Sequence, residues 1–250
     1  MPIAVEFLGR TRVLSEGREV ALSRQNISFL AYLVLFREID HPREVIIEQF
    51  WPSCEPTRGR SCLGTALLRL KRALQVNGSN WFEMSPRGEP RISSSAPIWF
   101  DIVEFEAAIM PALAAPEGML HATLLRNLAV GLTHYRGDLL IGWYDDWVLA
   151  ERERLRLVCL RGYRRLMEHY VSVGDMDKAL AAGQSALRIE PLQELVQQHV
   201  IELYYNTGQR VAAIRQYDKL AAMLKAELGI APSKNTTVLI DRIRSERPVS

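Results

Sequence analysis

The pattern of hydrophobic and polar residues changes along the chain from strand-like segments to a helical period. The first residues predict three short strands, because apolar segments are separated by turns at Gly9-Arg10 and Glu16-Gly17. From Ser23 onward apolar positions recur at helical spacing, with Ser23 as an N-cap and Trp51-Pro52 as a stop signal. The predicted strands are residues 3–8, 11–14 and 18–22, and the predicted helices are residues 23–36, 43–50 and 58–74.

The helix at residues 58–74 carries hydrophobic side chains on one face and cations on the other. Solvated helices normally carry charges of both signs, because i,i+4 pairs between them are stabilising. This helix contains no Asp or Glu, so its polar face indicates a polyanion or a protein partner. Leu63, Leu67, Leu70 and Leu74 form the apolar stripe, and Arg58, Ser61, Thr65, Arg69 and Arg72 lie opposite it.

A β-hairpin is expected after this helix. Two extended segments, residues 81–85 and 91–93, flank a turn in which Gly88 can adopt a positive φ. The hairpin carries two cations, Arg87 and Arg91. A turn at residues 77–79 precedes it, and residues 93–97 predict a linker beyond which strand signals disappear.

The remainder of the chain predicts helices almost without interruption from Ile102 onward, and Pro111 should kink or end the first of them. Three positions recur at one constant displacement of 34 residues: Tyr170, Gly174 and Ala179 return as Tyr204, Gly208 and Ala213. This is the period of tetratricopeptide repeats, in which a helix pair forms one stackable unit.

The net charge of +2 is unevenly distributed. Residues 1–97 contain 13 Lys and Arg against 10 Asp and Glu, whereas residues 98–250 contain 18 against 19. Between residues 58 and 91 there are seven cations and two anions, a local excess that favours attraction to phosphate. The longest apolar run, residues 29–36, is too short to span a bilayer, and no signal peptide is recognisable. We therefore expect a cytoplasmic, nucleoid-associated protein without a membrane segment.

No motif for catalysis or for a cofactor is found, so neither an enzyme nor a cofactor is predicted. The chain lacks G-x-G-x-x-G, G-x-x-x-x-G-K-[ST], H-E-x-x-H and G-x-S-x-G, and its five histidines have no ligand spacing. The three cysteines form no C-x-x-C pair and are interpreted as buried thiols. Asp138, Asp145 and Asp146 are better explained as helix caps beside an aromatic cluster than as metal ligands.

Strands, three helices and a hairpin in this order predict a winged helix–turn–helix, whose third helix enters a major groove while the wing approaches the DNA backbone. Arg69 has the planar fork to contact a guanine edge or a phosphate, and Thr65 and Ala66 are small enough to approach bases. The other predicted DNA contacts are Arg58, Arg60, Ser61, Leu68, Lys71 and Arg72 on the helix and Arg87 and Arg91 on the wing.

The predicted fold class is therefore α+β and mainly helical. An N-terminal winged helix–turn–helix, residues 1–95, is followed by an all-α tetratricopeptide-like helical repeat domain, residues 96–250.

Separated motifs along the chain resemble one family. The first group is L-A-Y-L-V-L-F at residues 30–36, P-R-E-V-I-I-E-Q-F-W-P at 42–52 and L-x-R-L-K-R-A-L at 67–74. The second group is W-F-D-I-V-E-F-E at 99–106, Y-R-G-D-L-L at 135–140, D-W-V-L-A-E-R-E-R-L at 146–155 and E-L-G-I-A-P at 227–232. Together these resemble bacterial regulators of the SARP/AfsR/DnrI class, which join an OmpR-type winged helix to a bacterial transcriptional activator domain.

The resemblance implies a pathway-specific activator that binds direct repeats in double-stranded promoter DNA, often as a head-to-tail pair, and contacts RNA polymerase. It also implies that the helix at 58–74 carries the base contacts and that the wing lies along the DNA backbone. Leu68 departs from the family, which often has a polar residue there. It could meet a thymine methyl, a second protomer or polymerase, or could weaken DNA binding, and we expect contact within a complex. Gly64 weakens the same helix by roughly 1 kcal/mol relative to alanine.

The helical domain is expected to present an interaction surface, because stacked helix pairs leave a concave face. Its arginine-rich segment, residues 151–165, is interpreted as a salt-bridged helix face in preference to a second contact with DNA or polymerase. An alternative for the whole chain is a protein-interaction adaptor whose winged helix no longer binds DNA. A ligand-responsive or enzymatic helical domain is a third interpretation. Salt dependence distinguishes DNA binding from an adaptor.

Overall fold

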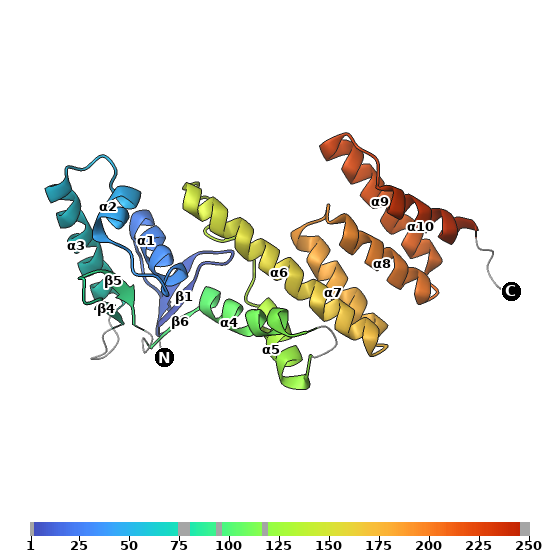
Figure 1. Cartoon of the computed structure of the whole chain (residues 1–250), viewed down its shortest axis with the longest axis horizontal. Helices are drawn as coiled ribbons and strands as arrows, with labels where there is room; N and C mark the ends of the chain where they lie inside the picture. The colour runs from blue at the N-terminus through green and yellow to red at the C-terminus, as the bar shows by residue number, and fades with distance from the viewer. Residues whose placement is uncertain (1–2, 75–80, 94–96, 117–119, 246–250) are drawn as a thin grey trace. The chain divides into compact units, whose positions relative to one another are not determined.

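A four-stranded sheet lies in the first of two compact units of the computed structural model, which describes residues 3–74, 81–93, 97–116 and 120–245 (Figure 1). This unit is drawn from residues 1–107 and 134–152. Val5 pairs with both Val13 and Phe100, and all three side chains are buried, so the sheet directs a hydrophobic face into the core. The strand order is β3-β2-β1-β6, with β1 (Ile3–Glu6), β2 (Arg12–Ser15) and β3 (Arg18–Glu19) antiparallel and β6 (Ile98–Phe100) parallel to β1.

Strand β6 corrects the sequence analysis, which predicted no strand beyond residue 97. It consists of only three residues, and its partner β1 lies far earlier in the sequence, with Ile98 paired to Ile3. Such a segment gives no periodic signal of its own, because pairing with a distant strand determines its conformation. The predicted turn at 77–79 and residues 94–96 of the predicted linker lie outside the described residues.

One buried carboxylate joins the sheet to the start of helix α4 (Asp101–Ala114). Asp101 accepts hydrogen bonds from the backbone N–H groups of Phe7 and Leu8, each at 2.8 Å, and from its neighbour Ile102 at 2.8 Å. Burial raises the pKa of Asp101 to about 6, although the three N–H donors act in the opposite direction. The side chain thus satisfies main-chain donors that would otherwise be buried without acceptors.

Three helices follow the antiparallel strands: α1 (Arg24–Leu35), α2 (Arg43–Phe50) and α3 (Pro56–Ala73). As predicted, Ser23 caps α1 by accepting the N–H of Asn26 at 3.3 Å, and α2 ends before Trp51-Pro52. Helices α2 and α3 approach closely at Gly59, where an added Cβ would lie 2.4 Å from Cγ2 of Ile47. Only glycine permits this packing without displacement of a neighbouring side chain.

The predicted hairpin forms from β4 (Phe82–Met84) and β5 (Pro90–Ile92). Gly88 has a φ of +81°, which is the positive value that the turn requires. Inside the turn, Ser85 Oγ donates to Glu89 Oε2 at 2.8 Å. Arg43, at the start of α2, donates to the carbonyl oxygen of Gly88 at 2.6 Å. The wing is therefore attached to the helices by a side chain that the sequence analysis did not single out.

A segment from later in the sequence completes the first unit. The N–H of Gly9 donates to the carbonyl of Asp138 at 3.0 Å, and the N–H of Leu140 donates to that of Phe7 at 3.0 Å. Trp147 lies in the first turn of α6 (Asp146–Ser172) and packs edge-on against Tyr32, with ring centroids 5.4 Å apart. The compact units consequently divide the chain differently from the predicted sequence domains, because residues 98–107 and 134–152 pack with the winged helix–turn–helix.

The second unit comprises residues 108–133 and 153–250 and is helical throughout its described elements. Helix α4 continues through Pro111 to Ala114, so this proline does not end the helix, one of the two predicted outcomes. An added Cβ on Gly131 would lie 2.6 Å from Cβ of Ala108, which shows how closely α5 packs on α4. The other helices are α5 (Ala122–Leu132), α7 (Met176–Ile189), α8 (Glu194–Asn206), α9 (Arg210–Leu228) and α10 (Lys234–Ser245).

The 34-residue repeat corresponds to two equivalent helix pairs. Gly174 and Gly208 end α6 and α8 with φ values of +79° and +77°. The residue after each glycine donates its N–H to the main-chain carbonyl oxygen of the repeated tyrosine, at 2.9 Å for Tyr170 and 2.8 Å for Tyr204. Ala179 and Ala213 are both fully buried in the helices that follow. Equivalent turns and equivalent buried alanines confirm the tetratricopeptide-like architecture.

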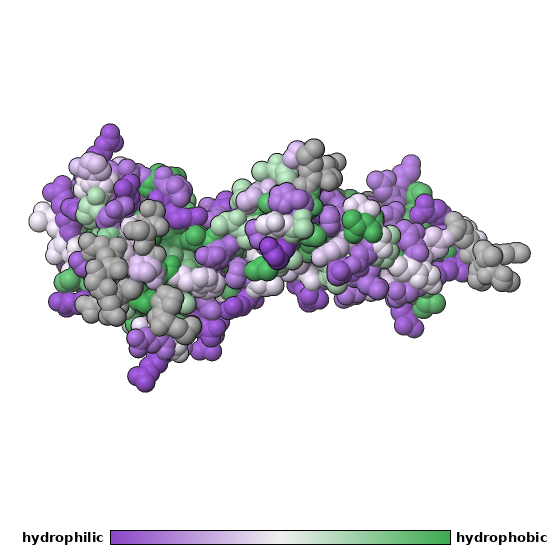
Figure 2. Space-filling model, turned by 90° about the horizontal axis from the view of Figure 1, so that it is seen from below, coloured by the Kyte–Doolittle hydropathy of each residue, from purple (hydrophilic) through white to green (hydrophobic). Residues whose placement is uncertain are grey.

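Some large hydrophobic side chains are exposed, among them Leu68, Tyr144 and Val211. The face in Figure 2 is mostly hydrophilic, with small hydrophobic patches between the polar side chains. Within the described ranges, no helix combines the length and hydrophobicity needed to cross a bilayer.

Cys159 is buried, and burial raises the pKa of its thiol, but Cys54 and Cys62 are only half-buried. The expectation that all three thiols are buried is therefore wrong for two of them.

Candidate nucleic-acid interface

Helix α3 presents its predicted polar residues to solvent. The leucine stripe, Leu63, Leu67, Leu70 and Leu74, is buried as expected, which fixes the opposite face outward. Eight of the nine predicted contact residues on this helix are exposed: Arg58, Arg60, Ser61, Thr65, Leu68, Arg69, Lys71 and Arg72.

Ala66 is the exception. It is only 4% exposed and lies beside Leu67 and Leu70 on the core-facing side of the helix. The prediction that Ala66 approaches a base is therefore contradicted by its burial. Its small side chain lets α3 pack closely on its neighbours. Small size alone therefore does not distinguish a packing residue from one that approaches DNA.

The cations of α3 differ in whether the protein already neutralises them. The guanidinium of Arg60 lies 3.7 Å from Glu44 in α2, and both side chains are exposed. Arg58, Arg69, Lys71 and Arg72 make no ion pair within the part of the chain that the structure describes. Lys71 and Arg72 lie in the last turn, where cations also interact favourably with the helix dipole. Four cations of one helix thus remain available to an external anion.

Between these cations the surface is neutral and open. Thr65 Oγ1 donates to the carbonyl of Ser61 at 2.9 Å, which leaves its oxygen able to accept a further hydrogen bond. An added Cβ on Gly64 would meet no atom within 4 Å. Leu68 is 48% exposed in the middle of this face, so a large apolar side chain sits among the cations. The face can therefore offer charge, hydrogen bonds and one hydrophobic contact.

The two cations of the wing have different surroundings. Arg87 is exposed in the turn and makes no ion pair among the described residues. Arg91 is half-buried, with its guanidinium 3.1 Å from Glu83 on the neighbouring strand and 3.9 Å from Asp40 in the connection between α1 and α2. Both acids hold Arg91 within the protein, so Arg87 is the more available of the two cations.

Most arginines of the arginine-rich segment of α6 have partners within the protein, and Arg161 is the exception among the described residues. Arg156 lies 3.0 Å from Glu153 and 3.2 Å from Glu190, and Arg164 lies 3.4 Å from Glu168. Arg152 and Arg165 instead donate to main-chain carbonyl oxygens. These contacts support the interpretation of a structural helix face over a second DNA contact.

Metal chemistry has no site among the described residues, because no group of three or more His, Cys, Asp or Glu side chains is placed to hold an ion. Asp138 is not the helix cap that the sequence suggested, because α5 ends at Leu132 and α6 begins only at Asp146. It accepts a hydrogen bond from Tyr135 at 2.8 Å instead. Asp146 is the first residue of α6, where an acidic side chain is favourable.

The second half of the chain determines the family. The sequence profile of the bacterial transcriptional activator domain matches residues 100–244, more than half of the chain. The chain belongs to the bacterial transcriptional activator domain family. Together with the winged helix–turn–helix, this family membership identifies a SARP-type transcriptional regulator, as the sequence motifs implied.

Two mycobacterial proteins resemble this family member over almost its whole length. They are the transcriptional regulatory proteins MoaR1 of Mycobacterium bovis BCG and of Mycobacterium tuberculosis H37Rv. Each is 24% identical over 254 residues, which cover 98% of this chain and 81% of the relative. The likeness therefore extends through the winged helix as well as the activator domain.

A solved structure, Mycobacterium tuberculosis EmbR in complex with a low-affinity phosphopeptide, has the same fold. The TM-score is 0.75 at 20% identity, over 99% of this chain. This chain spans 66% of the length of the EmbR chain. At this identity the likeness establishes the fold of this chain alone. Any ligand of this chain must be inferred from its own residues.

Proposed function

We propose that this regulator binds double-stranded promoter DNA in a sequence-specific manner through α3 and the β4–β5 wing, and that it activates transcription by contacting RNA polymerase. One observation carries the proposal: the exposed face of α3 holds four cations without ion pairs within the described residues, although acidic residues pair with cations elsewhere in the same unit. In a winged helix–turn–helix this helix enters the major groove.

The exposed side chains suit different parts of the duplex. Arg69 lies on the open face of α3, and its planar guanidinium can donate two hydrogen bonds to the acceptors of a guanine edge. Cations that flank it need only approach phosphates, which position the protein without reading sequence. We assign the phosphate contacts to Arg58, Arg60, Lys71 and Arg72 on the helix and to Arg87 on the wing, with Ser61 and Thr65 as hydroxyl partners.

Arg91 and Leu68 have more specialised roles in this proposal. Arg91 reaches the backbone only at the expense of its pairs with Glu83 and Asp40, so its main effect is to position the wing. Leu68 provides an apolar contact within the complex, with a thymine methyl, a second protomer or polymerase. Binding of direct repeats by a head-to-tail pair is part of the same proposal, and it places the protein at the nucleoid in the cytoplasm.

Fluorescence anisotropy with labelled duplexes tests the proposal. Sequences selected from a random pool by the full chain serve as specific targets, and a scrambled duplex serves as the reference. Arg69→Ala should remove about 1–3 kcal/mol of discrimination at one base position. Lys71→Ala should weaken binding to every duplex and reduce the slope of log affinity against log salt by about 1.

Lys225→Ala is the matched control, because Lys225 is an exposed cation on α9, in the other unit. It should leave duplex affinity unchanged. Retention of wild-type affinity by both Arg69→Ala and Lys71→Ala would exclude the proposed interface. Weak salt dependence in the wild-type chain would favour the adaptor alternative. Transcription from a selected template with purified polymerase then tests activation separately.

A further inference from the structure

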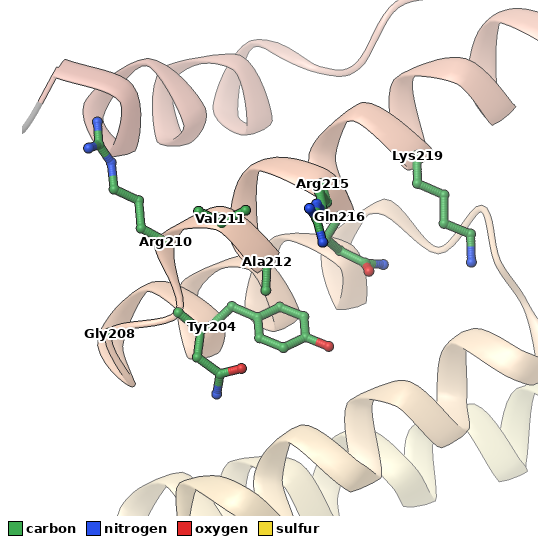
Figure 3. Close-up of a pocket in the computed structure, with 9 residues that line it drawn as sticks. Tyr204, Gly208, Arg210, Val211, Ala212, Arg215, Gln216 and Lys219 are labelled. Atoms are coloured by element: carbon green, nitrogen blue, oxygen red, sulfur yellow. The ribbon is translucent and has the colours of Figure 1, made fainter.

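The second unit contains an open groove beside α9, with a volume of about 630 Å³ (Figure 3). Nine residues line it, from the end of α8 to the middle of α9, and they include three cations and no anion. The groove therefore has one sign of charge on its walls. None of the proposed DNA-contact residues of the winged helix lines this groove.

Two of the three cations are available to a ligand. Arg210 is already used, because it donates to the carbonyl oxygens of Ile243 at 2.8 Å and Arg244 at 2.7 Å, and in Figure 3 it turns away from the groove. Arg215 and Lys219 are exposed and make no ion pair within the described residues. The adjacent carboxylate of Asp218 is bound by Arg244 at 3.0 Å, so it does not neutralise them.

Neutral polar groups accompany these cations. Figure 3 shows Tyr204, Gln216 and Lys219 extending into the open space beside α9. The amide nitrogen of Gln216 donates to Gln197 Oε1 at 2.6 Å, which leaves its carbonyl oxygen able to accept a hydrogen bond. Tyr204 Oη accepts from Gln184 at 2.8 Å and retains its own O–H to donate. The groove thus offers a hydrogen-bond donor and an acceptor together, which a peptide amide can match.

The spacing of the cations fits an extended chain. Arg215 and Lys219 are four residues apart in α9, which separates them by about 6 Å along the helix axis. Alternate side chains of an extended peptide are about 6.6 Å apart on the same side of the chain. We propose that this groove binds an extended acidic peptide segment of a partner protein, with carboxylates at alternate positions facing Arg215 and Lys219.

Duplex DNA fits the same groove less well. The sugar–phosphate backbone presents acceptors only, so the carbonyl oxygen of Gln216 would face other acceptors without a donor. A peptide backbone supplies N–H groups as well as carbonyl groups, and its acidic side chains supply the negative charge. The polar composition of the groove therefore selects a polypeptide, while its charge selects an acidic one.

The test is fluorescence anisotropy of the full chain with a fluorescein-labelled peptide of alternating Glu and Ser at low ionic strength. The double variant Arg215→Gln/Lys219→Gln should bind this peptide about tenfold more weakly. A matched double variant, Lys225→Gln/Lys234→Gln, removes two exposed cations that do not line the groove and should bind like wild type. A peptide with Gln in place of Glu should not bind. Thermal unfolding followed by circular dichroism verifies that both variants are folded.

Three results would overturn the proposal. The first is no binding of the Glu-Ser peptide by the wild-type chain. The second is an equal loss in both double variants, which would mean attraction by net charge alone. The third is displacement of the peptide by duplex DNA whose own binding depends on Arg215 and Lys219, which would assign the groove to nucleic acid. None of these outcomes depends on Arg69 or Lys71, so the α3 interface and the α9 groove are tested independently.

Discussion

Helices α3 and α6 are both rich in arginine, yet they use it in opposite ways. On α3, Arg58, Arg69 and Arg72 are exposed and have no ion pair within the described residues. On α6, Arg156 and Arg164 pair with carboxylates, and Arg152 and Arg165 donate to carbonyl oxygens. The number of cations on a helix therefore does not show whether the helix binds another molecule. The acceptors that the fold places beside each cation determine which cations remain unpaired.

The difference also has a physical origin in the sequence. Acidic residues occur among the arginines of α6, at Glu151 and Glu153, whereas α3 contains none. Exposed pairs of this kind contribute little to stability, but they cancel charge locally. Arg161 on α6 is exposed and makes no ion pair in the described ranges, so the division between the helices is strong without being complete.

Replacement of a structural arginine should have the largest effect. Arg152 donates to the carbonyl oxygens of Leu139, Leu140 and Trp143 at 2.8–3.0 Å. Arg152→Ala leaves these acceptors without a donor and should lower the free energy of unfolding by about 3 kcal/mol. Urea denaturation measures this change. Arg152→Lys, which keeps the charge without the planar fork, should recover only part of the loss. A loss below about 1 kcal/mol in the alanine variant would assign Arg152 to the same class as the arginines of α3.

Substitution of the two glycines of α3 allows a comparison between the packed face and the open face of one helix. An added Cβ on Gly59 would lie 2.4 Å from Ile47, so Gly59→Ala should destabilise the protein by about 2 kcal/mol. Gly64 has no atom within 4 Å of that position, so Gly64→Ala should stabilise it by about 1 kcal/mol. Thermal or urea unfolding of the two variants gives the sign directly. Equal effects would show that the open face is packed in solution.

Asp101 is a buried acidic side chain that main-chain N–H groups hold, in contrast to the exposed cations of α3. Its pKa is about 6 in the folded chain, against 3.8 as a reference, so folding takes up a proton between these values. The contribution of Asp101 to stability should therefore increase as the pH falls, by about 1 kcal/mol between pH 7 and pH 5. Asp101→Asn should remove this increment, which is measured as the difference between wild type and variant in urea unfolding at the two pH values, because His41 and His134, whose pKa values burial lowers from 6.5, titrate in both proteins. An equal pH dependence of stability in wild type and variant would mean that a group other than Asp101 takes up the proton between pH 7 and pH 5.

Glu6 should act in the opposite sense at lower pH. Burial alone would raise its pKa, but hydrogen bonds from Arg12 and Arg136 lower it below 4.5. Its contribution is present above pH 4.5 and is lost as the pH falls through the lowered pKa. Restricting the Asp101 measurement to pH 5–7 keeps the two carboxylates apart.

The smallest effects on stability are expected at exposed cations. Arg164→Ala removes an i,i+4 pair with Glu168 and should cost about 0.5 kcal/mol or less. Arg72→Ala removes no ion pair among the described residues and should also leave stability within about 0.5 kcal/mol. Only Arg72→Ala should weaken duplex binding, by roughly fivefold at low salt. Equal effects of the two substitutions on duplex affinity would contradict the distinction between α3 and α6.

Local signals in the sequence were sufficient for much of the winged helix–turn–helix. The N-cap at Ser23, the stop at Trp51 and the glycine turn at Gly88 all lie where predicted, because each depends on residues within a few positions. The repeat was also recognisable, since Gly174 and Gly208 occupy equivalent turns. These features need no knowledge of distant partners.

Features that depend on distant partners were not predictable in the same way. Strand β6 exists because β1 is beside it, and Arg91 is held by Asp40, which lies 51 residues earlier. Ala66 was assigned to the outer face because a small residue suits close approach to DNA and helix packing equally well. The cations of α3 could be found from sequence, but whether each has a partner required the fold.

The distribution of the first unit over the chain has a consequence for its synthesis. Strand β1 acquires its parallel neighbour only with residues 98–100, and the contacts of Gly9 and Tyr32 require residues 138–147. At translation rates of about 5–20 residues per second, the 57 residues between positions 95 and 152 take roughly 3–11 s to add. During that interval β6 is already made, but the segment that hydrogen-bonds to Gly9 and packs on Tyr32 is still missing. The ribosome must therefore deliver the first part of the activator domain, residues 100–152, before the unit that holds α3 can finish folding.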